Sequence, residues 1–168
     1  VLRHAGDAFI ALGRTGCVTA WNRQAELVFG YTRDEVLGQP LAPLIIPEAM
    51  RAAHDSGMLQ FTQYGTGPMV GKRMEVEALH RTGQRIPIEI SLSAMDRGDH
   101  FVAHAFLRDI SERKAAERAL ALSEAKLRGV TDNLPALVSH LDAQERFTFV
   151  NSAVREWWGL EPEALDAL

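Results

Sequence analysis

The sequence has few of the features that mark secreted and membrane proteins. Among its 168 residues there is one cysteine, Cys17, which excludes an internal disulfide framework and a zinc site built from several cysteines. No apolar run approaches the roughly 18 residues that a membrane-spanning helix needs, and residues 1–7 lack the regions of a signal peptide. We therefore expect a cytoplasmic location and no membrane contact by this fragment.

The charge and the side-chain chemistry exclude two further classes. The net charge is -4, and Lys and Arg form only short pairs, whereas a nucleic-acid footprint needs a basic cluster. No nucleophile–base pair and no kinase or cyclase motif is present. We expect neither nucleic-acid binding nor enzyme activity from this fragment.

One stretch of the sequence occurs twice. Residues 22–36, NRQAELVFGYTRDEV, reappear in altered form as residues 151–165, NSAVREWWGLEPEAL, and a strand-like apolar run precedes each copy. A period of about 130 residues is the size of a domain, so it indicates a tandem array of folded modules. The predicted division is a domain over 1–110, a linker helix over 111–133 and the truncated start of a second domain over 134–168.

The first repeat alternates between strand and helix patterns in a fixed order. Asn22 is a good helix N-cap, Gly30 a good helix end, and Thr32 with Glu35 forms a capping box. The pattern predicts a hairpin at 8–12 and 17–21, helices at 22–29, 32–38 and 47–64, and strands at 73–79, 86–95 and 101–107. Segregated strands and helices favour an α+β fold with an antiparallel sheet covered by helices on one face.

The apolar phase of these elements predicts the residues of the core. Each lies on the apolar side of its predicted helix or strand, and we expect all of them to be buried between the sheet and the helices: Val28, Phe29, Ile88, Ile90, Val102 and Phe106.

Three motifs follow one another in a fixed order. They are the Trp-Asn-x-x-Ala-x-x-x-Phe-Gly-Tyr stretch at 21–31, the strand-turn-strand pattern at 79–90 and the closing Asp109-Ile-Ser at the start of the predicted linker helix. Together they resemble a PAS domain of a bacterial signalling protein. The resemblance covers residues 1–112 and implies a five-stranded antiparallel sheet flanked by short helices that enclose a small pocket. It also implies a sensory role, with Asp109 and Ile110 relaying the signal into the linker helix, and it leaves the ligand open. In that family this aspartate commonly ties the last strand to a basic residue, so we expect Asp109 to bond a nearby arginine or the first turn of the linker helix.

The predicted linker helix carries a heptad seam. Its apolar and small residues are spaced alternately by four and three: Ala116, Leu120, Ser123, Leu127, Val130 and Leu134. About two heptads with small residues in the seam are too few to specify a coiled coil, but the resemblance to PAS domains implies a parallel homodimer. The alternative is a solitary amphipathic helix that packs back on its own domain.

One histidine offers a possible cofactor site. His54 lies on the predicted helix 47–64, with Met58 one turn further on, and the stretch resembles the part of oxygen-sensing heme PAS domains whose histidine is the proximal iron ligand. In that resemblance Arg73 approaches the heme or its bound gas. The alternative, which we favour, is a histidine that makes hydrogen bonds with no metal and a domain without heme.

The sequence thus leaves three hypotheses of function. The preferred one is a non-enzymatic sensory and dimerisation module that binds a small molecule or a partner and passes the signal to a downstream effector domain, a histidine kinase or a diguanylate cyclase. The second is a heme-based oxygen or redox sensor with His54 as the iron ligand. The third is a structural protein–protein interaction module with no ligand.

Overall fold

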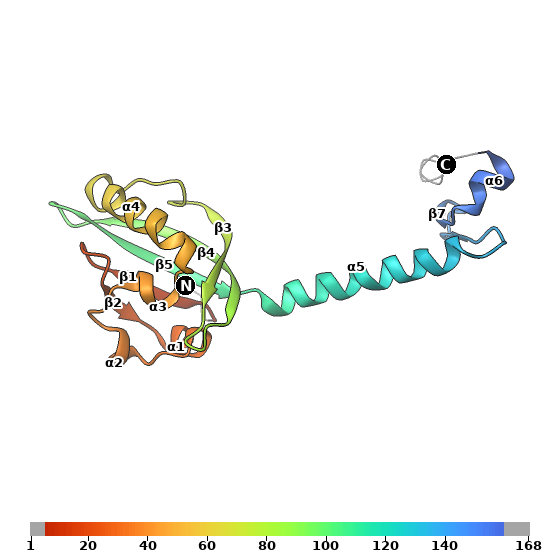
Figure 1. Cartoon of the computed structure of the whole chain (residues 1–168). Coiled ribbons are helices and arrows are strands. Elements are labelled where there is room, and N and C mark those ends of the chain that lie inside the picture. Colours follow the sequence, from red (N-terminus) through yellow and green to blue (C-terminus); the bar gives the residue numbers. More distant parts are fainter. Residues whose placement is uncertain (1–5, 160–168) are drawn as a thin grey trace. The chain divides into compact units, whose positions relative to one another are not determined.

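The computed structural model describes residues 6–159 (Figure 1). The chain divides into two compact units, with the boundary in the sequence between Arg113 and Lys114. Over residues 6–109, the first unit has five strands and four helices. Their bounds are β1 Ala8–Leu12, β2 Val18–Trp21, α1 Arg23–Phe29, α2 Arg33–Val36, α3 Leu41–Ile45, α4 Glu48–Tyr64, β3 Arg73–Leu79, β4 Arg85–Asp96 and β5 Phe101–Asp109.

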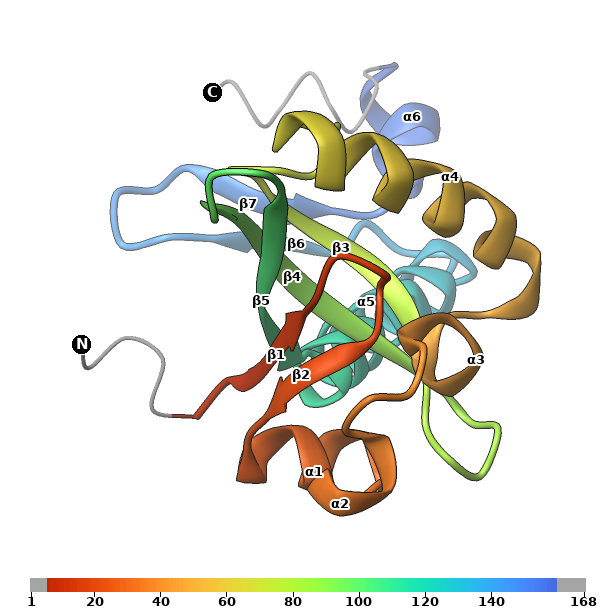
Figure 2. The same cartoon turned by 90° about the vertical axis from the view of Figure 1, so that its left-hand side faces the viewer.

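The strands of the first unit form one antiparallel sheet. Their order is β2-β1-β5-β4-β3, so β1 and β5 lie side by side although the chain visits β5 last. Helices α3 and α4 lie over one face of this sheet (Figure 2). The predicted five-stranded α+β fold is therefore confirmed, and the face under the helices holds the core. The buried residues of this core include Ile10, Val18, Trp21, Phe29, Val36, Ile45 and Phe61.

The local signals act as the sequence predicts. Asn22 caps α1 by accepting the Ala25 amide through Oδ1 at 2.9 Å, and Gly30 ends the helix in the left-handed region with φ of 78°. A β-carbon at Gly30 would collide with the His80 ring, so two constraints select glycine there. The capping box is present too, because the Thr32 amide donates to Glu35 Oε2 at 2.7 Å.

The predicted phase of β5 was wrong. Phe29 and Ile88 are buried as expected, whereas Val28 and Ile90 are only partly buried against the same core. On β5, however, Ala103 and Leu107 face the core, which places Val102 and Phe106 on the opposite face of the sheet.

The register explains this phase. Leu107 pairs with Ala8 of β1, which is fully buried, whereas Phe106 pairs with Phe9 on the outer face. The two ring centroids are 5.1 Å apart. Apolar residues occupy both faces of β5, so alternation alone did not distinguish the face that meets the helices.

One short helix escaped prediction. Helix α3 has only five residues, Leu41–Ile45, and contains Pro43, so it has neither the length nor the periodicity that reveals a helix in a sequence. It nevertheless buries Leu41, Ala42 and Ile45.

The second unit contains most of the linker helix and the start of the second repeat. Helix α5 spans Ser111–Asp132, close to the predicted 111–133, and β6 Ser139–Leu141, β7 Phe147–Val150 and α6 Ala153–Trp158 follow. Strands β6 and β7 form an antiparallel hairpin, and Val150 and Val154 are buried with Leu137 and Phe147 against them. Within residues 6–159, no helix is long and apolar enough to cross a membrane.

Candidate functional site

A groove runs along α4 in the first unit. Its volume is 240 Å³, and three segments form its walls: the turn between β1 and β2, the start of α3 and one side of α4. The residues that line it are Arg14, Thr15, Gly16, Pro40, Leu41, Ala42, His54, Asp55, Met58, Leu59 and Thr62. The lining is mostly apolar and carries a few polar side chains, the usual composition of a small-molecule site.

The predicted site residues His54 and Met58 lie together in this groove. The His54 side chain is 21% exposed, and its Nδ1 lies 3.1 Å from Asp55 Oδ1, so a carboxylate orients the ring. Met58 packs against the core from the same helix. The groove therefore presents one imidazole beside an apolar wall.

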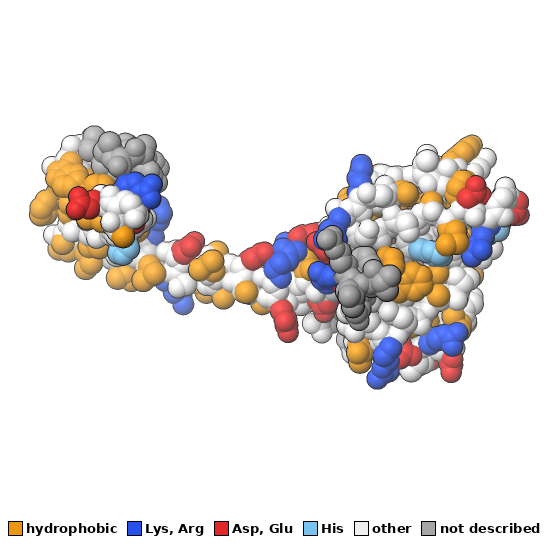
Figure 3. Space-filling model, turned by 180° about the vertical axis from the view of Figure 1, so that it is seen from behind, with side chains coloured by type: hydrophobic (Ala, Val, Ile, Leu, Met, Phe, Trp, Pro, Cys, Tyr) orange, Lys and Arg blue, Asp and Glu red, His pale blue; other side chains and the backbone are white. Residues whose placement is uncertain are grey.

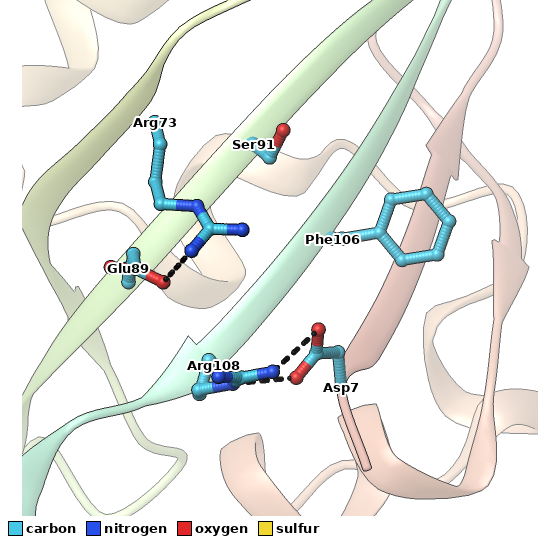
Figure 4. A pocket seen from close by; sticks show the side chains of 6 residues that line it. All are labelled: Asp7, Arg73, Glu89, Ser91, Phe106 and Arg108. Atoms are coloured by element: carbon cyan, nitrogen blue, oxygen red, sulfur yellow. Dashed lines mark hydrogen bonds and ion pairs between the residues drawn. The ribbon is translucent and has the colours of Figure 1, made fainter. Parts of the chain in front are cut away.

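Arg73 does not join them. Side chains of β3 point alternately to the two faces of the sheet, and Ala78, an odd number of residues from Arg73, faces the core. Arg73 therefore lies on the outer face, where its Nη1 is 3.4 Å from Glu89 Oε1 (Figure 4). It borders a separate hollow of only 10 Å³. These positions do not fit a porphyrin held between His54 and Arg73. Within residues 6–159, no cluster of three or more His, Cys, Asp or Glu side chains could hold a metal ion.

The second candidate site is the junction where β5 passes into α5. Asp109 Oδ1 accepts the Ser111 amide at 2.8 Å, so the predicted hydrogen bond between Asp109 and the first turn of the helix is confirmed. Ile110, between them, is 4% exposed, and its amide donates to the Pro87 carbonyl of β4 at 3.1 Å. Both residues predicted to relay a signal therefore fix the helix start to the sheet.

Two ion pairs border this junction on the outer face of the sheet. Arg113 lies in the first turn of α5, and its Nη2 is 2.7 Å from Oε1 of Glu75 on β3. Arg108 is the residue before Asp109, and its Nε lies 2.9 Å from Oδ1 of Asp7, directly before β1 (Figure 4). The hydrogen bond and charge of Asp7 raise the pKa of Arg108 above its usual value. The first turn of α5 is thus linked to β3 through Arg113, to β4 through Ile110 and to β5 through Asp109.

Helix α5 itself is at least partly exposed at every residue. Hydrophobic side chains are visible along its surface (Figure 3). The seam residues Leu120, Leu127 and Val130 are 62%, 65% and 64% exposed.

One functional feature was missed in the sequence. We predicted Asn22 only as a helix cap, but its side chain also accepts the Phe9 amide and donates to the Asp7 carbonyl. Asn151 makes the equivalent bonds in the second repeat. The recurrence of Asn in both copies, at the same distance from a strand, was the available signal.

Comparisons with known proteins agree for both repeats. Residues 6–112 match a model of the PAS domain family, and residues 125–168 match a second PAS domain model. The chain is 25% identical over 127 residues to Sensor protein FixL of Bradyrhizobium diazoefficiens, covering 76% of this chain and 25% of that protein. It is 29% identical over 126 residues to the signal transduction histidine-protein kinase AtoS of Escherichia coli, covering 74% of this chain and 19% of that protein. It therefore spans a quarter or less of these relatives.

A solved structure supports the fold. The PAS domain of a Colwellia psychrerythraea protein has a TM-score of 0.52 and 22% identity, covering 64% of this chain and 89% of that one.

Proposed function

This chain belongs to the PAS domain family, and from that premise we propose that it senses a small molecule in its first repeat and relays the bound state through α5 as a dimer. Its relatives include a sensor protein and a histidine kinase, so it is a sensory domain of a signalling protein. The ligand, the relay and the dimer are the parts that we propose.

The observation that carries the relay is the way α5 starts. Ile110 is buried against β4, Asp109 binds the Ser111 amide, and Arg113 pairs with Glu75 of β3. A shift of the strands therefore moves the first turn of the helix, because these contacts leave it little freedom. The rest of α5 has no buried residue and would carry that movement away from the sheet.

The exposed seam supports a dimer formed through α5. Burying each exposed leucine of the seam against a second copy is worth about 1.5–3 kcal/mol, so the seam leucines provide a driving force for a parallel pair. Burial in such a pair would explain why the seam residues are not covered by their own domain.

Sedimentation equilibrium of the whole chain tests the dimer. We expect a dimer that dissociates when Leu120→Lys and Leu127→Lys are combined, because two charges then face each other in the seam. Leu122→Lys is the matched control, since Leu122 is 57% exposed on the same helix but lies off the seam. A monomeric wild type, or a control that dissociates as readily, contradicts the proposal.

The groove along α4 is the proposed ligand site. Its volume suits a small, mostly apolar molecule that uses the polar groups of Arg14, Thr15 or His54 for orientation. Native mass spectrometry of the purified chain should detect a co-purified small molecule. Leu59→Trp, which fills the groove, should remove it, whereas Met50→Trp on the same helix, outside the groove, should retain it. A bound mass that survives Leu59→Trp argues against this site.

The output is proposed to reach an effector beyond residue 168, a histidine kinase as in AtoS or a diguanylate cyclase. Asp109→Ala in the full-length protein should change the effector activity, while it costs the first unit no more than about 1 kcal/mol. Asp34→Ala, in the exposed first turn of α2, is the control. Equal activity of Asp109→Ala and wild type would refute the relay.

A further inference from the structure

The end of α5 is fastened to the second repeat by three hydrogen bonds. Asn151 Nδ2 donates to the Thr131 carbonyl at 2.6 Å. The Ser152 amide donates to Asp132 Oδ1 at 2.7 Å, and Ser152 Oγ donates to the Asp132 carbonyl at 3.3 Å. Thr131 and Asp132 are the last two residues of α5, so the bonds hold its final turn.

Asn151 joins that turn to the hairpin of the second repeat. Its side chain is fully buried, its Nδ2 also donates to the Ala136 carbonyl at 2.9 Å, and its Oδ1 accepts the Val138 amide at 2.9 Å. Val138 directly precedes β6. One amide group therefore contacts both the end of the helix and the start of the hairpin, and the burial of Asn151 leaves no water to replace a lost partner.

The first repeat separates the two roles of this asparagine. Asn22 accepts the amide of Phe9, thirteen residues earlier, and donates to the carbonyl of Asp7, fifteen residues earlier. Asn151 makes the same two bonds at the same separations. These bonds hold the repeat together. The bond to Thr131 adds a contact to the preceding helix.

This fastening depends on the rotational phase of α5. The last carbonyls of a helix have no hydrogen-bond partner within the helix, and their directions are set by the rotation of its final turn. A shift of one residue turns the helix by about 100°, which would remove the Thr131 carbonyl and the Asp132 carboxylate from their partners together.

We propose that Asn151, Asp132 and Ser152 couple the last turn of α5 to the β6–β7 hairpin, so that the second repeat follows any rotation of the helix. The inference rests on the proposed relay through α5 and assigns its receiving end. Asn151 and Ser152 act as positioning residues, because they transmit movement and need not touch a ligand.

A neighbouring cap provides a matched control. Asn133 Nδ2 donates to the Gly129 carbonyl at 2.6 Å, which also caps α5, but this bond does not reach β6 or β7. Asn133→Ala should weaken the helix end without uncoupling the hairpin. The double variant Asp132→Ala, Ser152→Ala removes two of the three bonds, so it should loosen the coupling and leave the pairing of β6 with β7 intact.

The experiment measures a spin-label distance in the whole chain. Cys17→Ser removes the natural cysteine, and labels at Arg128→Cys on α5 and Gln144→Cys at the hairpin tip occupy exposed positions. We expect a narrow distance distribution in the wild type and in Asn133→Ala, and a clearly broader one in the double variant. In an unlabelled chain, the exchange rate of the Ser152 amide should rise about tenfold in Asp132→Ala, the effect of losing one ordinary hydrogen bond.

Three results would overturn the coupling: an unchanged distribution in the double variant, equal broadening in Asn133→Ala, or an unchanged Ser152 exchange rate. Amide exchange in β6 and β7 verifies that the hairpin remains folded. Repeating the distance measurement with Leu120→Lys and Leu127→Lys removes the proposed dimer, so a failure of the dimer and a failure of this coupling give different results.

Discussion

Asn22 and Asn151 hold equivalent strands through the same hydrogen bonds, although they lie in different units of the chain. Each Oδ1 accepts a backbone amide at 2.9 Å, from Phe9 of β1 in one unit and from Val138, directly before β6, in the other. The backbone amide of each asparagine also donates to the carbonyl of that same residue, at 3.1 and 2.9 Å. The repeat seen in the sequence is therefore a repeat of hydrogen bonds as well as of elements.

Replacement of Asn22 should destabilise the first unit. Asn22→Ala removes the cap of α1 and leaves the Phe9 amide and the Asp7 carbonyl without this partner, which should cost about 2–4 kcal/mol in the free energy of unfolding. Urea unfolding followed by Trp21 fluorescence measures the loss. Arg23→Ala, which removes the exposed ion pair between Arg23 and Glu26, is the control. An equal loss of unfolding free energy in both variants would contradict the stabilising role of the Asn22 side chain.

The hairpin turn of the second repeat contains a strained residue. Gly16 has φ of 74° in the first repeat, and Glu145 takes the equivalent position in the second with φ of 64°. Because a side chain disfavours this region, Glu145→Gly should stabilise the second repeat by about 0.5–1 kcal/mol, and Gly16→Ala should destabilise the first by a similar amount. Slower amide exchange in β6 and β7 would verify the first expectation, and faster exchange would reject it.

The fold was largely predictable from sequence because its elements carry local signals. Asn22, Gly30 and the pair Thr32 and Glu35 each satisfy backbone groups within a few residues of themselves, so their effect is readable without the tertiary structure. The phase of β5 was not readable. It depends on whether Phe106 or Leu107 meets the helices, and that is decided by the pairing with the distant strand β1.

The candidate sites likewise combine local contacts, which the sequence predicts, with long-range contacts, which it does not. The contact of Asp109 with the helix start is local and was predicted, whereas the pairs Arg113–Glu75 and Arg108–Asp7 join residues far apart in the sequence and were not. The placement of Arg73 on the other face of the sheet from His54 depended on the phase of β3 relative to the helices. Motif resemblance carries no information on that point.

The corrected phase of β5 has a direct consequence for stability. Leu107 is 3% exposed in the core, so Leu107→Ala should cost about 2–5 kcal/mol through lost burial and a cavity. Phe106→Ala should cost less, about 1–2 kcal/mol, because Phe106 is half-buried on the outer face, where it contacts Phe9. Parallel urea titrations of the two variants compare their losses of unfolding free energy. A larger loss in Phe106→Ala than in Leu107→Ala would support the strand phase expected from the sequence.

Acid should weaken the start of α2. The hydrogen bond from the Thr32 amide, then that from its hydroxyl, lowers the pKa of Glu35 below its usual 4.5, and Arg81 adds to the shift. A lowered folded pKa means that the stabilisation is fully present above pH 4.5 and is lost as the pH falls through the folded value. Carboxyl carbon NMR of Glu35 should find this pKa below 4.5, and Thr32→Val should move it upward. A value at or above 4.5 in the wild type would exclude the capping interaction in solution.

Hemin should not bind this chain stoichiometrically. His54 is held beside Asp55 in an open groove of 240 Å³, and Arg73 lies on the other face of the sheet, so the chain offers one imidazole without the second contact that the heme resemblance implies. Titration of the purified chain with hemin should give no saturable Soret shift at one equivalent. His54→Ala should behave like the wild type, and so should His104→Ala, which removes a histidine of the outer face. A tight complex that disappears in His54→Ala and persists in His104→Ala would instead establish His54 as an axial ligand and make heme the sensed cofactor.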